Sequence, residues 1–323
     1  GVTGSNGKST TAAMIAAILR ADGRRAWLGG NIGRSLLADL DRMGPGDWAV
    51  AELSSFQLHH LGPGTPMPRV AVVTGCSPNH LDWHGDWGSY VAAKQRILTG
   101  QPVDGVAVLN AHDSETAGWA PLVRGRLGSL PQLETLPPLR VPGDHNRLNA
   151  ALAAAAARAA SCGEESVETG LRRFPGLPMR LEWFAVIGGR RFYNDSTSTT
   201  PESTAAALEA IAEPVWLLAG GRDKGCAMER LSEAAAERAR GAALFGENGE
   251  SLRREISRLD PALPCTAVAT VGEALRWVWP RSKPGEAIVL SPGSASTDQY
   301  RDFRHRGREF AELVAATADP LRR

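Results

Sequence analysis

Residues Gly1 to Thr10 read GVTGSNGKST, the most informative stretch of the chain. A glycine-rich turn that runs into Lys-Ser-Thr predicts a set of backbone N–H groups at the start of a helix, where phosphate oxygens bind. Lys8 is the candidate for the β- and γ-phosphates, and the hydroxyl of Ser9 or Thr10 is the candidate ligand of Mg²⁺. The following run TTAAMIAAILRADG, with Gly23 as its stop, predicts that helix and argues against a flexible linker.

The loop is a variant of the usual phosphate-loop pattern. Its glycines are Gly1, Gly4 and Gly7, whereas the usual pattern has its first glycine at the place of Val2. Residue 1 already lies within the loop and is not a methionine. We therefore expect the strand that feeds the loop to be absent, and the chain to be a fragment that has lost its N-terminal part.

Composition narrows the class of protein and the kind of partner. The chain has 323 residues, of which 43% are hydrophobic and 22% charged, and its net charge is +1. These values are typical of a soluble globular protein and give no electrostatic reason to expect nucleic acid or a membrane surface as a partner. No apolar run approaches the length of a membrane span, and the four scattered cysteines argue against disulfides or zinc. We expect a cytoplasmic monomer.

Short apolar runs alternate with helical patterns, which predicts an α/β fold of parallel sheets covered by helices. The second half begins a new series, so we expect two sheets. The stretch Phe174-Pro-Gly-Leu-Pro178 is the candidate hinge, and we place the domains at 1–177 and 178–323. The expected strands span 25–28, 48–53, 70–74, 105–109, 184–187, 191–194, 215–219, 242–245 and 287–290. The expected helices include 90–99, 148–160, 204–211 and 228–240.

Polar side chains follow the expected strands, at the sheet edge where ligands bind. Glu52 closes the strand 48–53, where a phosphate-loop enzyme has a metal-binding carboxylate. The next polar residues in the same crevice are Ser54, Ser55 and Gln57. After strand 70–74, the candidate metal ligands are His80, Asp82 and His84, although zinc is disfavoured because no further ligand is evident. A lone histidine that caps a turn is the alternative interpretation.

Two further stretches allow both a functional and a structural interpretation. Lys94 lies on the apolar helix face of AAKQRI, which by itself predicts a lysine whose ammonium reaches solvent. In GDHNRLNAA, Asn146 and Asn149 are three residues apart at a helix start and share one face. Asn146 is also a candidate helix cap, and a cap can still contact a ligand.

Three loops rich in glycine or hydroxyl groups follow strands of the second half. DSTSTTPEST contains Asp195 and predicts a helix that begins with Thr200 as N-cap and Pro201 in the first position. The turn GGRDKG presents Lys224, and SPGSASTDQYRDF follows the strand 287–290. Together these loops predict a pocket for a small substrate that carries a carboxylate.

These motifs resemble those of the Mur ligases, most closely those of the glutamate-adding members, over the whole chain. The resemblance implies a central phosphate-loop ATPase domain with a mostly parallel sheet, followed by a C-terminal Rossmann-like α/β domain that binds the amino acid. The implied reaction uses ATP to join glutamate to UDP-N-acetylmuramoyl-L-alanine through an acyl phosphate, in peptidoglycan synthesis. The motifs, in order, are GVTGSNGKST, GNIG, ELSSFQL, SPNHLDWHG, AAKQRI, DHNRLNA, LPMRLE, NDSTSTTPEST, GGRDKG and SPGSASTDQYRDF.

The resemblance also implies roles for particular residues. Phosphate and Mg²⁺ are held by the loop residues Gly4, Asn6, Gly7, Lys8, Ser9 and Thr10. Glu52 binds the first Mg²⁺, while His80 and Lys94, the latter as its carbamate, serve a second. The residues implied for the muramoyl substrate are Asn31, Ser54 and Gln57. Those for ATP are Asn146, Asn149, Arg180 and Asp195, and those for glutamate are Thr199, Lys224, Ser296, Thr297 and Phe303.

Two departures from the family pattern leave alternatives open. Thr197 stands where many relatives have a lysine after Asp-Ser, so the handedness of the glutamate is open, with D-glutamate favoured over L-glutamate. We also expect this chain to be without the family's UDP-binding first domain. The alternatives are another Mur ligase or a folylpolyglutamate synthase, a phosphate-loop kinase or switch, and a fragment that binds nucleotide without ligase activity.

Overall fold

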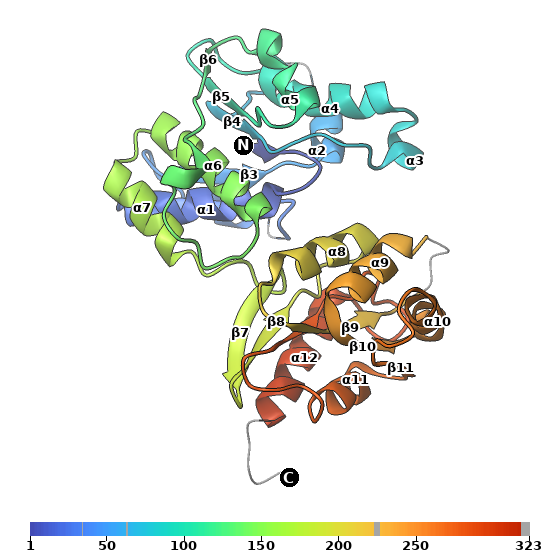
Figure 1. Ribbon diagram of the computed structural model, residues 1–323. Helices are drawn as coiled ribbons and strands as arrows, with labels where there is room; N and C mark the ends of the chain where they lie inside the picture. Colours follow the sequence, from blue (N-terminus) through green and yellow to red (C-terminus); the bar gives the residue numbers. More distant parts are fainter. Residues whose placement is uncertain (34, 63, 223–226, 318–323) are drawn as a thin grey trace. The chain divides into compact units, whose positions relative to one another are not determined.

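The computed structural model describes residues 1–33, 35–62, 64–222 and 227–317, without the side chain of Asp82. Lys224, which is predicted to contact the glutamate substrate, therefore lies outside the described residues. The chain divides into two compact units. One comprises Gly1–Arg140 and Asp144–Phe174, and the other comprises Val141–Gly143 and the chain from Pro175 onward. Each unit is built around its own six-stranded sheet (Figure 1).

The sheet of the N-terminal unit is parallel throughout, in the order β2-β3-β1-β4-β5-β6. Its strands are β1 (Val2–Thr3), β2 (Ala26–Gly30), β3 (Trp48–Glu52), β4 (Val70–Val73), β5 (Val106–Leu109) and β6 (Arg126–Leu127). Its helices are α1 (Lys8–Ala21), α2 (Ser55–His60), α3 (Leu81–His84), α4 (Trp87–Thr99), α5 (Ser114–Ala117), α6 (Asp144–Ala159) and α7 (Glu164–Arg173). Short 3₁₀ turns are η1 (Leu37–Arg42), η2 (Ala120–Leu122) and η3 (Leu133–Thr135).

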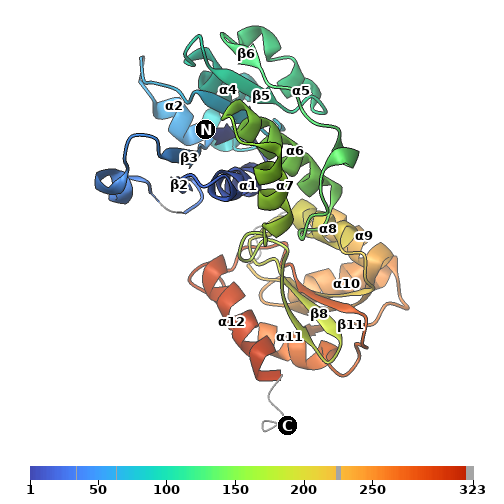
Figure 2. The same ribbon diagram turned by 90° about the vertical axis from the view of Figure 1, so that its left-hand side faces the viewer.

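Both faces of this sheet are covered, which is why its strands are almost wholly apolar. Along β4, Ala71 and Val73 join the cluster formed with α2 and α4, while α6 packs against β4 and β5 from the other side. Figure 1 and Figure 2 both show α6 and α7 beside α1. The helices α1 and α7 approach closely, since a Cβ at Gly170 would lie 2.6 Å from the Cα of Ile18.

The sheet of the C-terminal unit has the order β11-β10-β9-β12-β8-β7. All neighbours are parallel except β7, which runs antiparallel to β8. Its strands are β7 (Glu182–Ile187), β8 (Arg190–Asn194), β9 (Val215–Gly220), β10 (Ala239–Phe245), β11 (Cys265–Val268) and β12 (Ala287–Leu290). Its helices are α8 (Pro201–Ala210), α9 (Glu229–Arg238), α10 (Gly249–Leu259), α11 (Val271–Val278) and α12 (Phe303–Thr317).

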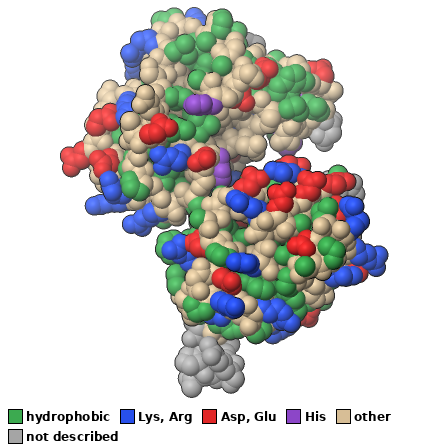
Figure 3. Space-filling view, in the orientation of Figure 1, with side chains coloured by type: hydrophobic (Ala, Val, Ile, Leu, Met, Phe, Trp, Pro, Cys, Tyr) green, Lys and Arg blue, Asp and Glu red, His purple; other side chains and the backbone are tan. Residues whose placement is uncertain are grey.

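Alternate residues of β9 enter two separate cores of this unit. Leu217 packs with α8, α9 and α10, whereas Trp216 and Leu218 pack with α11 and α12. Charged side chains of both signs are interspersed on the face that Figure 3 shows, as the net charge of +1 predicts. Among the described residues, every helix is too short or too polar to span a bilayer.

The α/β class and the two sheets are confirmed, and one expectation about the first residues is wrong. The strand that feeds the phosphate loop is not absent, because Val2 and Thr3 form β1 at the centre of the sheet. Val2 pairs with Glu52 of β3 and with Val72 of β4. The loop therefore leaves the carboxyl end of a central strand, which is where a parallel sheet presents its ligands.

Candidate active site

The phosphate loop has a backbone that only glycine can follow. Gly4 has a φ of +147°, and a Cβ there would lie 2.0 Å from the Thr74 hydroxyl oxygen. Gly7 caps α1 with a φ of +79°, and a Cβ there would lie 2.3 Å from Asn149 Oδ1. The N-cap residue Gly7 has no side chain with which to cap the first N–H groups of α1. These N–H groups and the helix dipole together favour an anion at this point.

Two lysine ammonium groups converge on one carbonyl of this loop. Lys8 Nζ donates to the carbonyl oxygens of Gly4 and Ser5, each at 2.9 Å. Lys94 Nζ reaches the same Gly4 oxygen from α4 at 2.8 Å. With the loop's N–H groups, the Lys8 ammonium forms a positively charged cradle for phosphate oxygens.

Lys94 is buried, so the interpretation that its ammonium reaches solvent is wrong. Its exposed fraction is 2%. Burial, together with the nearby charge of Lys8, lowers the pKa of Lys94 to about 7. The Tyr90 ring lies 4.6 Å from Nζ, and the Tyr90 hydroxyl is 2.8 Å from the Ser5 hydroxyl. A lysine held in this way is a neutral amine for much of the time at neutral pH, and a neutral amine is a nucleophile.

Glu52 ends β3 beside this loop with one carboxylate oxygen unused. Its exposed fraction is 1%. Oε1 accepts a 2.8 Å hydrogen bond from Asn31 Nδ2, while Oε2 is buried and accepts no hydrogen bond within the described part of the chain. A buried carboxylate oxygen without a partner is costly. A hard cation such as Mg²⁺ would satisfy it.

The predicted muramoyl residues Ser54 and Gln57 form a capping box at the start of α2. Gln57 N donates to the Ser54 hydroxyl, and Ser54 N donates to Gln57 Oε1. The box fixes the direction in which α2 leaves the end of β3. Asn31, also predicted for this substrate, is the residue that holds Glu52.

The histidines after β4 do not form a protein-only metal cage. His80 is the N-cap residue of α3 with a φ of +54° and no side-chain cap bond, and its ring lies against Phe56 at 5.0 Å. His84 Nε2 lies 3.0 Å from the Ser55 hydroxyl. Within the described residues, no group of three His, Cys, Asp or Glu side chains could hold a metal ion.

The two asparagines at the start of α6 lie against the phosphate loop. Asn149 Nδ2 donates to Asn146 Oδ1 at 3.3 Å, and Asn149 Oδ1 accepts from the Thr11 hydroxyl at 3.3 Å. Because α6 begins at Asp144, Asn146 lies inside the first turn, and its interpretation as the helix cap is wrong.

In the C-terminal unit, the described residues predicted to contact glutamate follow the neighbouring strands β8 and β12. Thr200 caps α8 as predicted, with Pro201 in the first position, and Thr199 precedes it, half-buried. After β12, Ser296 is buried while Thr297 is exposed. Phe303 begins α12.

Asp195, which is predicted to contact ATP, is buried among hydrogen-bond donors. Its carboxylate accepts from the Ser198 hydroxyl at 2.5 Å, from the Ser291 hydroxyl at 2.7 Å and from Leu181 N at 2.8 Å. Burial outweighs these bonds and raises the pKa of Asp195 to about 6. Arg180, also predicted for ATP, is exposed and acts weakly in the opposite direction.

We expect Asp195→Asn to change how the stability of this unit depends on pH. The folded carboxyl binds its proton more tightly than the unfolded one, so its contribution to the free energy of unfolding falls as pH rises through 6. Between pH 5 and pH 8 the wild type should lose about 1 kcal/mol that the asparagine variant keeps. Urea unfolding at both pH values measures this difference, and parallel curves would contradict the expectation.

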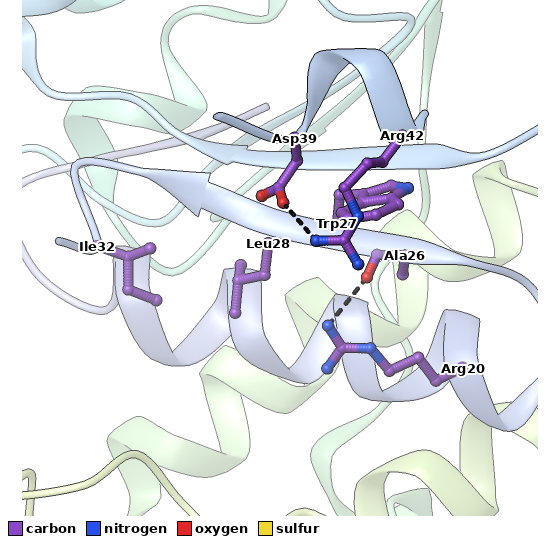
Figure 4. A pocket seen from close by; sticks show the side chains of 7 residues that line it. All are labelled: Arg20, Ala26, Trp27, Leu28, Ile32, Asp39 and Arg42. Carbon is purple, nitrogen blue, oxygen red and sulfur yellow. Dashed lines mark hydrogen bonds and ion pairs between the residues drawn. The ribbon is translucent and has the colours of Figure 1, made fainter. Parts of the chain in front are cut away.

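A hollow of about 530 Å³ elsewhere in the N-terminal unit holds none of the predicted site residues (Figure 4). It lies against β2, where Arg20 donates to the Ala26 carbonyl oxygen at 2.9 Å. Arg42 lies opposite, 3.3 Å from Asp39. The residues lining the hollow are Arg20, Ala26, Trp27, Leu28, Ile32, Asp39 and Arg42.

Comparison with known proteins bears on what this arrangement does. The profile of the Mur ligase middle domain matches residues 2–126, and that of the Mur ligase glutamate ligase domain matches residues 179–294. A UDP-N-acetylmuramoylalanine–D-glutamate ligase of Symbiobacterium thermophilum is 35% identical over 98% of this chain and 75% of its own length. The enzyme of the same name from Geobacillus kaustophilus is 37% identical over 97% and 74%. The chain belongs to the Mur ligase family.

Solved Mur ligases share the fold. MurF of Acinetobacter baumannii is 19% identical with a TM-score of 0.74, over 98% of this chain and 75% of that one. MurC of Thermotoga maritima is 18% identical with a TM-score of 0.70, over the same shares. Mur ligases are ATP-dependent amide ligases that generally require Mg²⁺. The alternative of a kinase or switch from another family is therefore wrong.

The structure of this Mur ligase also shows contacts made at the candidate site by residues that the sequence analysis did not identify. Tyr90 lies one helical turn before Lys94, and that spacing could have pointed to it. Thr74, Ser291 and Arg306 had no such signal, because their partners are far away in the sequence.

Proposed function

We propose that this chain carries the ligase activity that joins D-glutamate to UDP-N-acetylmuramoyl-L-alanine with ATP, in peptidoglycan synthesis. The observation that carries the proposal is the phosphate loop with the buried Lys94 on its Gly4 carbonyl. The names of the relatives at about 35% identity supply the substrate class and favour D-glutamate despite Thr197. We place the reaction in the cytoplasm, where ATP is available, and propose that the enzyme acts as a monomer.

The proposal takes residues 1–177 as the central ATP-binding domain and residues 178–323 as the C-terminal glutamate-binding domain, which also contributes two residues to ATP. Lys8 and the N–H groups after Gly4 hold the β- and γ-phosphates, with Asn6, Gly7 and Thr10 in the same loop. ATP is also contacted by Asn146, Asn149, Arg180 and Asp195. The muramoyl acid is contacted by Asn31, Ser54 and Gln57. Glutamate is contacted by Thr199, Lys224, Ser296, Thr297 and Phe303. The substrate carboxylate takes the γ-phosphoryl group of ATP to become an acyl phosphate, and ADP leaves. The glutamate amine then attacks the acyl carbon, loses a proton and forms the amide as inorganic phosphate leaves.

Two magnesium sites belong to the proposal, and the buried Glu52 and Lys94 fit them. Glu52 Oε2, which accepts no hydrogen bond within the described residues, and the Ser9 hydroxyl would hold one ion. His80 and Lys94 would serve the second. The neutral amine of Lys94 can add CO₂ to form a carbamate, an anionic oxygen ligand of the kind Mg²⁺ prefers. When bound, the ions would neutralise charge on the transferring phosphoryl group.

We expect the full-length protein to release phosphate from ATP only when both UDP-N-acetylmuramoyl-L-alanine and glutamate are present. Each amino acid is tested at the same concentration in a coupled phosphate assay, with D-glutamate compared with L-glutamate. The controls omit one substrate at a time. Release driven equally well by meso-diaminopimelate, or by a folate in place of the muramoyl acid, would contradict the proposal.

A further inference from the structure

Arg306 of α12 is a buried cation, and its hydrogen bonds within the described part of the chain all go to neutral acceptors. Its exposed fraction is 0%. Nε donates to the Ser196 hydroxyl at 3.1 Å, Nη2 to the Ser196 carbonyl at 3.0 Å and Nη1 to the Ser294 carbonyl at 3.1 Å. Burial lowers the pKa of Arg306 to about 10, so it stays charged at neutral pH. Within the described residues, none of the ion pairs includes Arg306.

These three bonds connect loops that follow two neighbouring strands. Ser196 lies just after β8 and Ser294 just after β12, and the two strands pair in parallel. The Ser196 hydroxyl in turn donates to the Phe303 carbonyl at 2.8 Å. One guanidinium therefore connects three segments that carry described residues assigned to glutamate: Thr199, Ser296 with Thr297, and Phe303.

A second buried group, which carries the opposite charge, connects the same two loops. Asp195 accepts from Ser198 of the first loop and from Ser291 of the second. Asp195 and Arg306 form no ion pair with each other. Each side chain makes hydrogen bonds with atoms of the loops. Buried charges add little net stability, so holding a particular geometry is the better reason for such an arrangement.

We infer that Arg306 is a positioning residue for the amino-acid substrate, acting through Ser196 and Ser294 to set the spacing of the two loops around it. The inference rests on the proposed function. The planar guanidinium supplies donors in fixed directions, whereas the ammonium of lysine is a single point that cannot reach both loops in the same way. The charge alone is therefore insufficient, and lysine should not replace arginine.

The test measures steady-state kinetics of the full-length enzyme for Arg306→Lys, Arg306→Met and Ser196→Ala. The matched control is Arg308→Met, an exposed position on the same helix. We expect the KM for glutamate to rise about tenfold or more in both Arg306 variants, and less in Ser196→Ala, which loses one acceptor. The KM for ATP should change by less than about twofold, and the control should behave as wild type.

Three outcomes would overturn parts of this account. An unchanged KM for glutamate in folded Arg306→Lys would overturn the role of Arg306. Equal rises in the KM values for ATP and glutamate would show a general structural defect instead, with the same consequence. If Arg306→Met does not fold, the lysine and Ser196→Ala variants decide. Absence of glutamate-dependent phosphate release in the wild-type enzyme would overturn the proposed function itself. This measurement is made on the wild type alone, so it is distinct from the comparison of the variants.

Discussion

Lys94→Ala is expected to lower ligase turnover by about 10²- to 10³-fold. The variant removes the buried amine that touches the phosphate loop at Gly4, and with it the anionic ligand that a carbamate would provide. The cavity left behind can admit a small anion, so added formate or acetate should restore part of the rate. Turnover is measured as glutamate-dependent phosphate release, with and without the added acid.

The control is Lys283→Ala, which removes an exposed lysine far along the chain and should leave turnover unchanged. A direct readout is the carbamate carbon signal from ¹³C-bicarbonate, present in the wild type and absent in Lys94→Ala. Because the pKa of Lys94 is lowered to about 7, the neutral amine that reacts with CO₂ becomes the major form as pH rises above 7. Undiminished turnover in Lys94→Ala would remove the carbamate proposal.

Glu52→Gln should lower turnover by a similar factor, about 10²- to 10³-fold. It should also raise the Mg²⁺ concentration that the reaction requires. The amide has the shape of the carboxylate and can keep the hydrogen bond from Asn31. It lacks the charge, and one of its two polar atoms is a donor that cannot bind a cation. A Mg²⁺ titration of the reaction rate measures the shift in half-saturation.

The same substitution should leave the fold intact or stabilise it without Mg²⁺, since the amide is neutral and a buried negative charge is removed. Thermal unfolding with and without Mg²⁺ checks this. Glu134→Gln, at an exposed position, is the matched control and should change neither quantity. A Mg²⁺ dependence identical to wild type in Glu52→Gln would contradict the role of this side chain as a metal ligand.

The strands predicted most accurately from sequence are those with continuous apolar runs. Residues 70–74 and 287–290 were predicted almost to the residue, as β4 and β12, because strands buried on both faces of a parallel sheet must be apolar throughout. The missed strands are short or half-exposed. β1 and β6 have only two residues each, and β11 is half-buried along its length. Pairing with a neighbour defines them, and that signal does not lie in their own residues.

The same division holds for the candidate site. The phosphate loop was predictable because its chemistry is local: glycines that adopt positive φ, a lysine and two hydroxyls lie within ten residues. The capped start of α8 at Thr200 was predictable for the same reason. Sequence spacing alone left Lys94 as a lysine that reaches solvent, because periodicity shows which face of a helix is apolar but not how deep it is buried.

What the sequence determined by itself was the alternation of strands and helices, the loop that cradles phosphate and the family to which these motifs belong. Only the tertiary structure decided the electrostatics: the burial of Lys94 beside Lys8, the unused oxygen of Glu52 and the bonds from Arg306 to two loops. The physical reason is range. Turn and helix propensities act over a few neighbours, whereas desolvation and hydrogen-bond satisfaction depend on groups that only the folded chain brings together.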